Sequence, residues 1–196
     1  LTIFPNRNFK RLREDKDIFK IYAFIIGFIA FCAASSALSA QYFKKKFDFI
    51  SFGSEIKGVQ STDILQKLGL QKDEYFLFVG RFISDKGFQY LIPAFEKLAT
   101  NKKLVLVGGS PNPTEFEVDL QKTTDPRIMF AGFIYGDDTV TLMQNAYAYC
   151  QPSDIEGLSP VILSVMGLGT PLICSNIKEN LYLVKDDALT FEKSNV

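Results

Sequence analysis

The feature that most constrains this chain is a regular alternation of short apolar runs with stretches of helical periodicity. The apolar runs cover residues 75–79, 104–107, 128–131, 147–151 and 171–174. Helical patterns separate them, at residues 88–98, 114–122, 137–146 and 160–168. Strands that are apolar on both faces and alternate with helices of about three turns are typical of a parallel sheet covered on both sides. We therefore expect an α/β fold built from right-handed βαβ units.

Weaker signals mark where this domain begins. We expect a short helix to start within residues 61–63 and to end at Gly69. We interpret residues 58–73 as a linker into a Rossmann-like domain over residues 74–196. Pro93 falls inside the first long helical pattern, where it is expected to kink the helix or to shift its start.

An uncharged segment at residues 21–43 precedes this domain and leaves two interpretations open. Its length makes it a candidate membrane span. Only its first half is strongly apolar, however, so the favoured interpretation is a set of buried elements, with residues 1–57 as the remnant of another domain. The sequence begins with Leu1 rather than an initiator methionine, and the residues before position 21 show no signal-peptide pattern. The chain is therefore expected to be part of a longer protein.

Composition excludes several classes of function. The 196 residues contain no histidine, which excludes Ser-His-Asp and Cys-His nucleophiles and zinc sites that need imidazole. Basic and acidic residues balance at 22 each, so nucleic acid is not expected as a partner. The paired aspartates at 137–138 and 186–187 have no partner ligands at a recognisable spacing, and no metal or cofactor is expected.

The three cysteines point to a reducing compartment. Cys32, Cys150 and Cys174 are odd in number, widely spaced and embedded in apolar segments. They show neither a disulfide framework nor CxxC spacing. We therefore expect buried free thiols and a cytoplasmic protein.

The most informative polar residues follow the predicted strands, because an open parallel sheet binds its ligand beyond the carboxyl ends of the strands. Arg81 and Lys86 follow the first strand, and residues 153–160, which include Glu156, precede the last long helix. Two cations and a helix N-terminus are suited to stabilise a diphosphate leaving group. The alternative is that these charged residues are solvated loop residues. Neither a GxGxxG nor a GxxxxGK[ST] motif occurs, so dinucleotide-dependent dehydrogenases and P-loop NTPases fit poorly.

An ordered set of motifs resembles one known family. The motifs are YFLFVGRFISDKG at 75–87, KLVLVGG at 103–109, RIMFAG at 127–132, PS at 152–153 followed by EGLSP at 156–160, and GTP at 169–171. Together they resemble the nucleotide-sugar-binding half of a retaining glycosyltransferase of family 4. The resemblance implies a GT-B architecture, in which two Rossmann-like domains face each other across the active site. It also implies transfer of a sugar from a nucleotide diphosphate, without a bound metal, to an acceptor glycan or lipid that the sequence does not identify.

The resemblance implies roles for single residues. Arg81 and Lys86 look like the pair that holds the donor diphosphate, and Glu156 looks like the first glutamate of the family's E-x7-E motif, which contacts the donor sugar. These three are the candidate catalytic residues. Phe133 and Ile134 would line the base pocket. The full set of expected donor-binding residues is Gly80, Gly108, Gly132, Phe133, Ile134, Gly157, Leu158, Ser159, Pro160 and Ser164.

Two departures from the family pattern lead to competing hypotheses. The second glutamate of the motif falls at position 164, where a serine hydroxyl would bind the donor ribose more weakly than a carboxylate. The amino-terminal acceptor domain is expected to be missing apart from residues 1–57, and residues 74–196 are expected to be incomplete at the C-terminus. We expect a glycosyltransferase fragment of hexosyltransferase type that is poorly active alone, or else a diverged, non-catalytic nucleotide-sugar-binding or scaffold module. A peripheral contact with the inner face of the membrane is a further expectation.

Overall fold

The structure, a computed structural model, describes residues 57–196 of the chain. These residues belong to one compact unit, Ser51–Val196. The expectations for the remnant domain, for the uncharged segment at 21–43 and for Cys32 lie outside the described residues.

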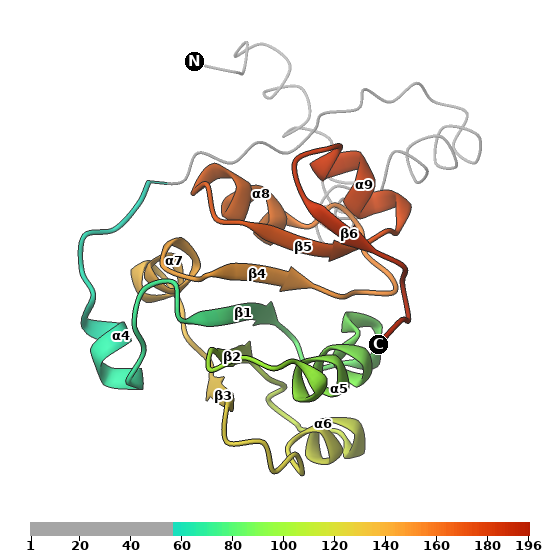
Figure 1. Cartoon of the computed structure of the whole chain (residues 1–196), viewed down its shortest axis with the longest axis horizontal. Coiled ribbons are helices and arrows are strands. Elements are labelled where there is room, and N and C mark those ends of the chain that lie inside the picture. The colour runs from blue at the N-terminus through green and yellow to red at the C-terminus, as the bar shows by residue number, and fades with distance from the viewer. Residues whose placement is uncertain (1–56) are drawn as a thin grey trace, which may run out of the picture. The chain divides into compact units, whose positions relative to one another are not determined.

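The described residues form a parallel sheet of six strands with the order β3-β2-β1-β4-β5-β6 (Figure 1). The strands are β1 (Tyr75–Gly80), β2 (Lys103–Gly108), β3 (Ile128–Gly132), β4 (Ala148–Gln151), β5 (Leu172–Ser175) and β6 (Leu189–Phe191). The helices are α4 (Asp63–Leu68), the 3-10 helix η1 (Ser84–Lys86), α5 (Phe88–Lys97), α6 (Glu115–Leu120), α7 (Asp137–Gln144), α8 (Pro160–Gly167) and α9 (Lys178–Val184). This strand order is the doubly wound one, and the prediction of a Rossmann-like α/β fold is confirmed.

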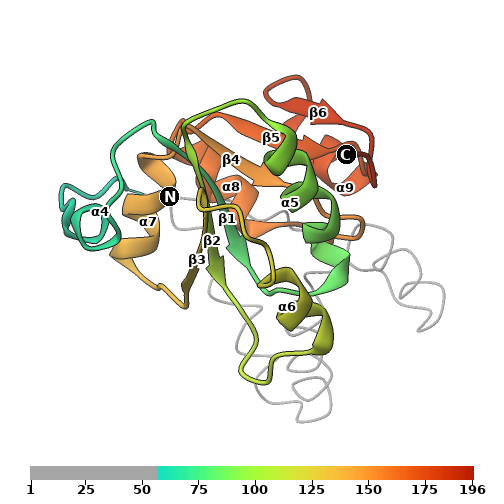
Figure 2. The same cartoon turned by 60° about the horizontal axis from the view of Figure 1, so that its bottom comes forward.

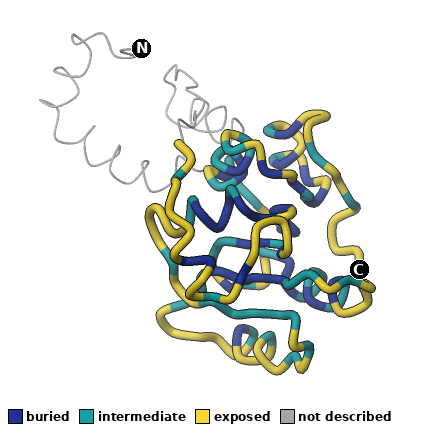
Figure 3. Tube along the Cα trace, turned by 60° about the vertical axis from the view of Figure 1, so that its left-hand side comes forward, coloured by how far each residue is buried: buried dark blue, intermediate teal, exposed yellow. Residues whose placement is uncertain are grey.

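The direction of the crossovers places the helices on two faces. The chain moves outward from β1 to β3 and then returns to β4, and right-handed crossovers put helices on opposite faces before and after this reversal. α5 and α6 accordingly lie on one side of the first strands, and α7 lies on the other (Figure 2). Within residues 57–196, β2 and β4 are largely buried, whereas β3 is only half-buried (Figure 3).

Each face of the sheet carries its own apolar cluster. On the α5 face the buried residues are mostly phenylalanine, and the ring of Phe78 meets that of Phe88 edge to face at 4.6 Å. On the opposite face Leu77 and Ile162 belong to a mostly aliphatic cluster, to which α4, β1, β2, α7, α8 and β5 all contribute. Because Leu77 and Phe78 are neighbours in β1, the two-residue period of the strand sends them to opposite faces.

The first long helix contains its proline without a break. α5 runs continuously from Phe88 to Lys97 with Pro93 inside it. Buried side chains on both sides of the proline, Phe88, Ile92 and Phe95, hold this helix against the sheet. Tertiary packing therefore offsets the hydrogen bond that proline removes.

Residues 58–73, which we expected to be a linker, pack against α7. α4 ends at Gly69, as predicted, and Ile64, Leu65 and Leu70 join the aliphatic cluster. The amide of Gln144 also bonds the backbone of Val59 in both directions. No helix within residues 57–196 is long and apolar enough to cross a membrane.

Three elements were not predicted. They are η1, α9 and β6, which have three, seven and three residues. β6 is mostly exposed, and α9 lacks a continuous apolar stripe, so neither gives a clear periodic signal.

Candidate functional site

The segments that we expected to bind a ligand follow β1 and β4, the neighbouring strands at which the order of the sheet reverses. Ligands of open α/β sheets bind in the crevice outside the carboxyl ends of such strands. Residues 81–87 follow β1, and residues 152–159 follow β4. The backbone N–H of Asp154 donates to the carbonyl oxygen of Asp85 at 2.9 Å, so the two segments are joined.

Gly87 allows this close approach. Its φ of +76° is in the left-handed region, and a Cβ atom built there would lie 2.0 Å from the carbonyl oxygen of Pro152. A side chain at position 87 would therefore push the two loops apart.

Lys86 and Glu156, two of the predicted catalytic residues, form an ion pair across this junction. Nζ of Lys86 donates to Oε1 of Glu156 at 2.5 Å. Only 18% of the lysine side chain and 8% of the glutamate side chain are exposed. The interpretation of Lys86 and Glu156 as separate solvated loop residues does not hold in this structure.

Glu156 is oriented by two further donors that the sequence reasoning missed. Nε2 of Gln151 donates to Oε1 of Glu156 at 2.5 Å, and Oγ of Ser153 donates to the same oxygen at 2.6 Å. Tyr149 supports Gln151, since its Oη lies 3.2 Å from Oε1 of the glutamine. Burial raises the pKa of Tyr149, so its hydroxyl keeps its proton. Polar residues at alternate positions 149, 151 and 153, in and just after an apolar strand, were the available signal.

Arg81, the third candidate catalytic residue, is exposed immediately after β1. No hydrogen bond or ion pair holds its guanidinium within the part of the chain that the structure describes. For Arg81 the alternative of a solvated loop residue is therefore not contradicted, whereas the charge of Lys86 is already paired.

Two neighbouring strands of the sheet end in glycine. Gly80 and Gly108 are register partners at the ends of β1 and β2. At Gly108, whose φ is +126°, a Cβ atom would lie 1.9 Å from the carbonyl oxygen of Gly80. These positions expose backbone where a side chain would otherwise stand.

Three of the expected donor-binding residues line one cavity of about 440 Å³ beyond β2 and β3. They are Gly108, Gly132 and Phe133. Ile134 is not among the lining residues, because its side chain packs against the aliphatic cluster. Gly109, which ends the KLVLVGG motif, also lines the cavity, and the lining residues that the sequence reasoning missed are Phe82, Glu117, Gln121 and Phe130.

The start of α8 follows the Glu156 loop. Ser159 caps the helix by accepting from the N–H of Ile162, and Pro160 occupies the first helical position. Gly157 and Leu158, between Glu156 and the cap, are half-buried. Ser164 donates its hydroxyl proton to the carbonyl oxygen of Pro160 at 3.0 Å, so its hydroxyl is engaged by its own helix.

No group of three or more cysteine, aspartate or glutamate side chains suited to hold a metal occurs within residues 57–196. The expectation of a site without metal or cofactor stays a prediction. Cys150 and Cys174 are buried and free, as expected.

Comparison with known proteins gives a consistent result. The family model of group 1 glycosyl transferases matches residues 60–196. An uncharacterized glycosyltransferase of Methanocaldococcus jannaschii is 31% identical over 141 residues, which are 69% of this chain and 36% of that protein. O-antigen chain mannosyltransferase B of Escherichia coli is 27% identical over 139 residues, or 68% of this chain and 36% of the mannosyltransferase. The chain thus spans about a third of the length of these relatives.

Solved structures share the fold. Sucrose-phosphate synthase from Thermosynechococcus elongatus superposes with a TM-score of 0.66 at 23% identity, covering 81% of this chain and 43% of that one. HepE from Anabaena, solved in complex with UDP and glucose, superposes with a TM-score of 0.63 at 21% identity. The match covers 70% of this chain and 40% of the HepE chain.

Proposed function

Because the chain belongs to the group 1 glycosyltransferase family, we propose that its crevice between β1 and β4 binds a nucleotide diphosphate sugar and holds it for sugar transfer. The observation that carries this proposal is the Lys86–Glu156 pair at the switch point of the sheet, with Arg81 unpaired beside the same strand end. A cation and an oriented carboxylate in one crevice suit a ligand with an anionic end and a hydroxyl-rich end. A nucleotide diphosphate sugar is such a ligand.

The proposed roles follow from where charge develops. When the bond between the sugar and the diphosphate breaks, the electron pair stays on the diphosphate oxygen, which gains negative charge. Arg81, Lys86 and the N-terminus of α8 would stabilise this charge without a metal. Glu156, held by Gln151 and Ser153, would accept hydrogen bonds from the sugar hydroxyls.

The comparisons support the ligand class. HepE is described in complex with UDP and glucose, and relatives of this chain are named mannosyltransferases. Retention of configuration at the transferred sugar is part of the proposal and is supported by the motifs that resemble retaining enzymes. The acceptor, a glycan or lipid, would be bound together with the other domain of a GT-B enzyme. Free buried thiols support the proposal of a cytoplasmic site of action.

Nucleotide binding by the Arg81→Ala variant tests this proposal. We expect the intact chain to bind UDP or GDP, and the variant to bind the same nucleotide at least about tenfold more weakly, because a charge-assisted hydrogen bond is lost. Isothermal titration calorimetry measures the dissociation constants. The matched control is Lys72→Ala, which removes an exposed positive charge just before β1, at the opposite end of that strand.

The control variant is expected to bind like the unmodified chain. If neither nucleotide shifts the melting temperature of the chain at millimolar concentration, the proposal is wrong. An equal loss of affinity in both variants would show that net charge, rather than the position of Arg81, governs binding.

A further inference from the structure

Glu117, on α6, carries a buried carboxylate that the proposed roles leave unused. Only 4% of the residue is exposed. Its Oε1 accepts from the backbone N–H of Ser110 at 3.3 Å. Its Oε2 is shielded from solvent and has no hydrogen-bond partner among the described residues.

The inward position of Glu117 is set by its helix. Thr114 caps α6 by accepting from the N–H of Glu117 at 3.4 Å, and in this first turn Oε1 of Glu117 reaches the backbone N–H of Ser110. Glu115, Val118 and Asp119 on the same helix are exposed. A buried carboxylate oxygen without a partner is costly, and such groups are rare in native proteins unless a ligand or water satisfies them.

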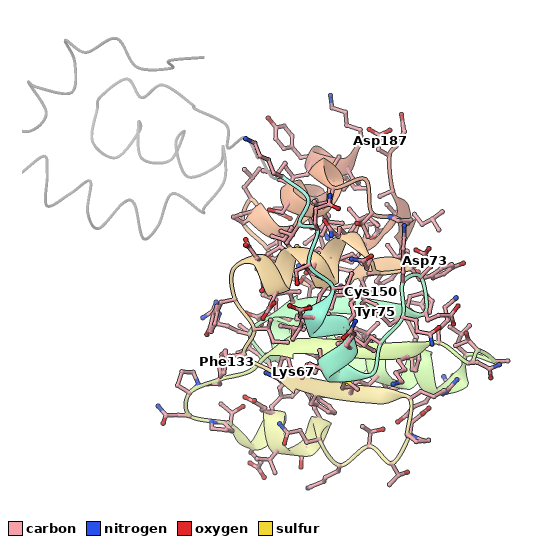
Figure 4. The ribbon with its side chains drawn as sticks, turned by 90° about the vertical axis from the view of Figure 1, so that its left-hand side faces the viewer. Lys67, Asp73, Tyr75, Phe133, Cys150 and Asp187 are labelled. Carbon is pink, nitrogen blue, oxygen red and sulfur yellow. The ribbon has the colours of Figure 1, made fainter. Side chains whose placement is uncertain are left out.

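The cavity around Glu117 is otherwise suited to a flat ring. Besides Glu117 and Gln121, its lining consists of glycines and the rings of Phe82, Phe130 and Phe133. A Cβ atom at Gly109 would lie 3.1 Å from Oε1 of Glu117 and 3.6 Å from the ring of Phe133, so these two side chains flank the same backbone. Phe133 is half exposed and lies at one end of the sheet, apart from Tyr75 and Cys150 in the core (Figure 4). The cavity is therefore lined by aromatic rings, glycine backbone and a carboxylate.

From this juxtaposition we infer that Glu117 selects guanine as the base of the donor nucleotide, an inference that rests on the proposed function. Guanine presents two adjacent donors, N1–H and the 2-amino group, which match the two oxygens of one carboxylate. Uracil presents a single N–H between two carbonyl oxygens, so a carboxylate that binds its N–H also faces an acceptor. The donor of this chain is then a guanosine diphosphate sugar.

The experiment measures the binding of GDP, inosine diphosphate and UDP to the whole chain by calorimetry. Inosine diphosphate differs from GDP by the loss of the 2-amino group alone. We expect GDP to bind about tenfold more tightly than inosine diphosphate or UDP, the effect of one charge-assisted hydrogen bond. This comparison needs no variant, so it stands even if a variant fails to fold.

The Glu117→Gln variant gives the second measurement. The glutamine amide keeps the size of the side chain but places a donor against the donors of guanine, and it pairs with the N–H and carbonyl of uracil. We expect GDP affinity to fall about tenfold and the preference for GDP over UDP to disappear. Glu115→Gln, which changes an exposed glutamate of the same helix, is the matched control and should bind like the unmodified chain.

The outcomes separate this inference from the proposed function. Equal affinities for the three diphosphates, or tighter binding of UDP, would overturn the role of Glu117 and leave the nucleotide site standing. A Glu117→Gln variant that folds and keeps the GDP preference would do the same. Failure of all three diphosphates to bind would overturn the proposed function, and the inference with it.

Discussion

At the scale of single residues, the contacts of Glu156 both orient its carboxylate and compensate its charge. Glu156 accepts three hydrogen bonds on one oxygen, from Lys86, Gln151 and Ser153. The neutral donors orient the carboxylate, and the lysine compensates its charge in a site from which most water is excluded. Under the proposed function an incoming diphosphate would compete for Lys86, and ligand binding would then be coupled to the pairing of Glu156.

Removal of the lysine should therefore reduce stability. We expect Lys86→Met to lower the free energy of unfolding by about 2 kcal/mol, because Glu156 keeps its two neutral donors while its charge loses compensation. Urea denaturation measures the change. Lys72→Met, at an exposed position, should change stability by less than about 0.5 kcal/mol.

The double variant Lys86→Met with Glu156→Gln isolates the cause. It should recover at least half of the lost stability, because the uncompensated charge is gone. A double variant less stable than Lys86→Met alone would show that packing of the lysine stem, rather than its charge, stabilises the junction.

At the scale of elements, the site depends on how closely the loops after β1 and β4 approach. The Asp154–Asp85 backbone hydrogen bond and the contact at Gly87 fix this approach. Both lie where η1 leads into α5, so a change there moves Lys86 as well as the helix.

Gly87→Ala tests this dependence. We expect it to lower the free energy of unfolding by more than about 3 kcal/mol, because the added methyl group meets the Pro152 carbonyl and the residue keeps a left-handed conformation. Gly69→Ala is the matched control: its φ is also left-handed, at +60°, but nothing lies within 4 Å of the new Cβ atom. This control should cost about 1 kcal/mol in the same urea titration. Equal losses in the two variants would contradict the steric explanation.

At the scale of the whole molecule, the two described cysteines report on unfolding of the sheet. Burial raises the pKa of Cys150 to about 12 and that of Cys174 to about 11, from a usual value of 9.0. Both thiols lie in neighbouring strands, β4 and β5. They stay protonated in the folded chain near neutral pH, and the thiolate is the reactive form.

In a Cys32→Ser variant, we expect Cys150 and Cys174 to react with iodoacetamide at pH 8 only as fast as the sheet unfolds. Mass spectrometry after timed labelling measures both sites. Their rates should be equal, because both thiols are exposed by the same event. Fast labelling of one site under conditions in which the chain is folded would contradict this.

The raised pKa values of the two thiols also determine how the stability of the chain changes with pH. Above pH 9 the unfolded chain releases thiol protons that the folded chain retains, so the unfolded state binds fewer protons. The contribution of these thiols to stability is complete below pH 9 and is lost as the pH rises toward 11 to 12.

Local pattern by itself determined the class of fold and the position of its long elements. Apolar periodicity and the helix-ending glycine at position 69 depend on neighbouring residues only, so α4, the first five strands and the α-helices α5 to α8 were predictable. The residues that resemble a donor site, Arg81, Lys86 and Glu156, were recognisable for the same reason.

Only the tertiary structure decided which of these residues act together. Lys86 and Glu156 lie 70 positions apart, and they meet because β1 and β4 are neighbours at the reversal of the sheet. The alternation of polar residues at positions 149, 151 and 153 was a local signal for the donors that orient Glu156, whereas nothing in the sequence separated Glu117 from other polar residues. The order of the strands, the direction of the crossovers and the close approach of two loops determine which groups surround these side chains. All three depend on contacts between segments that are distant in sequence.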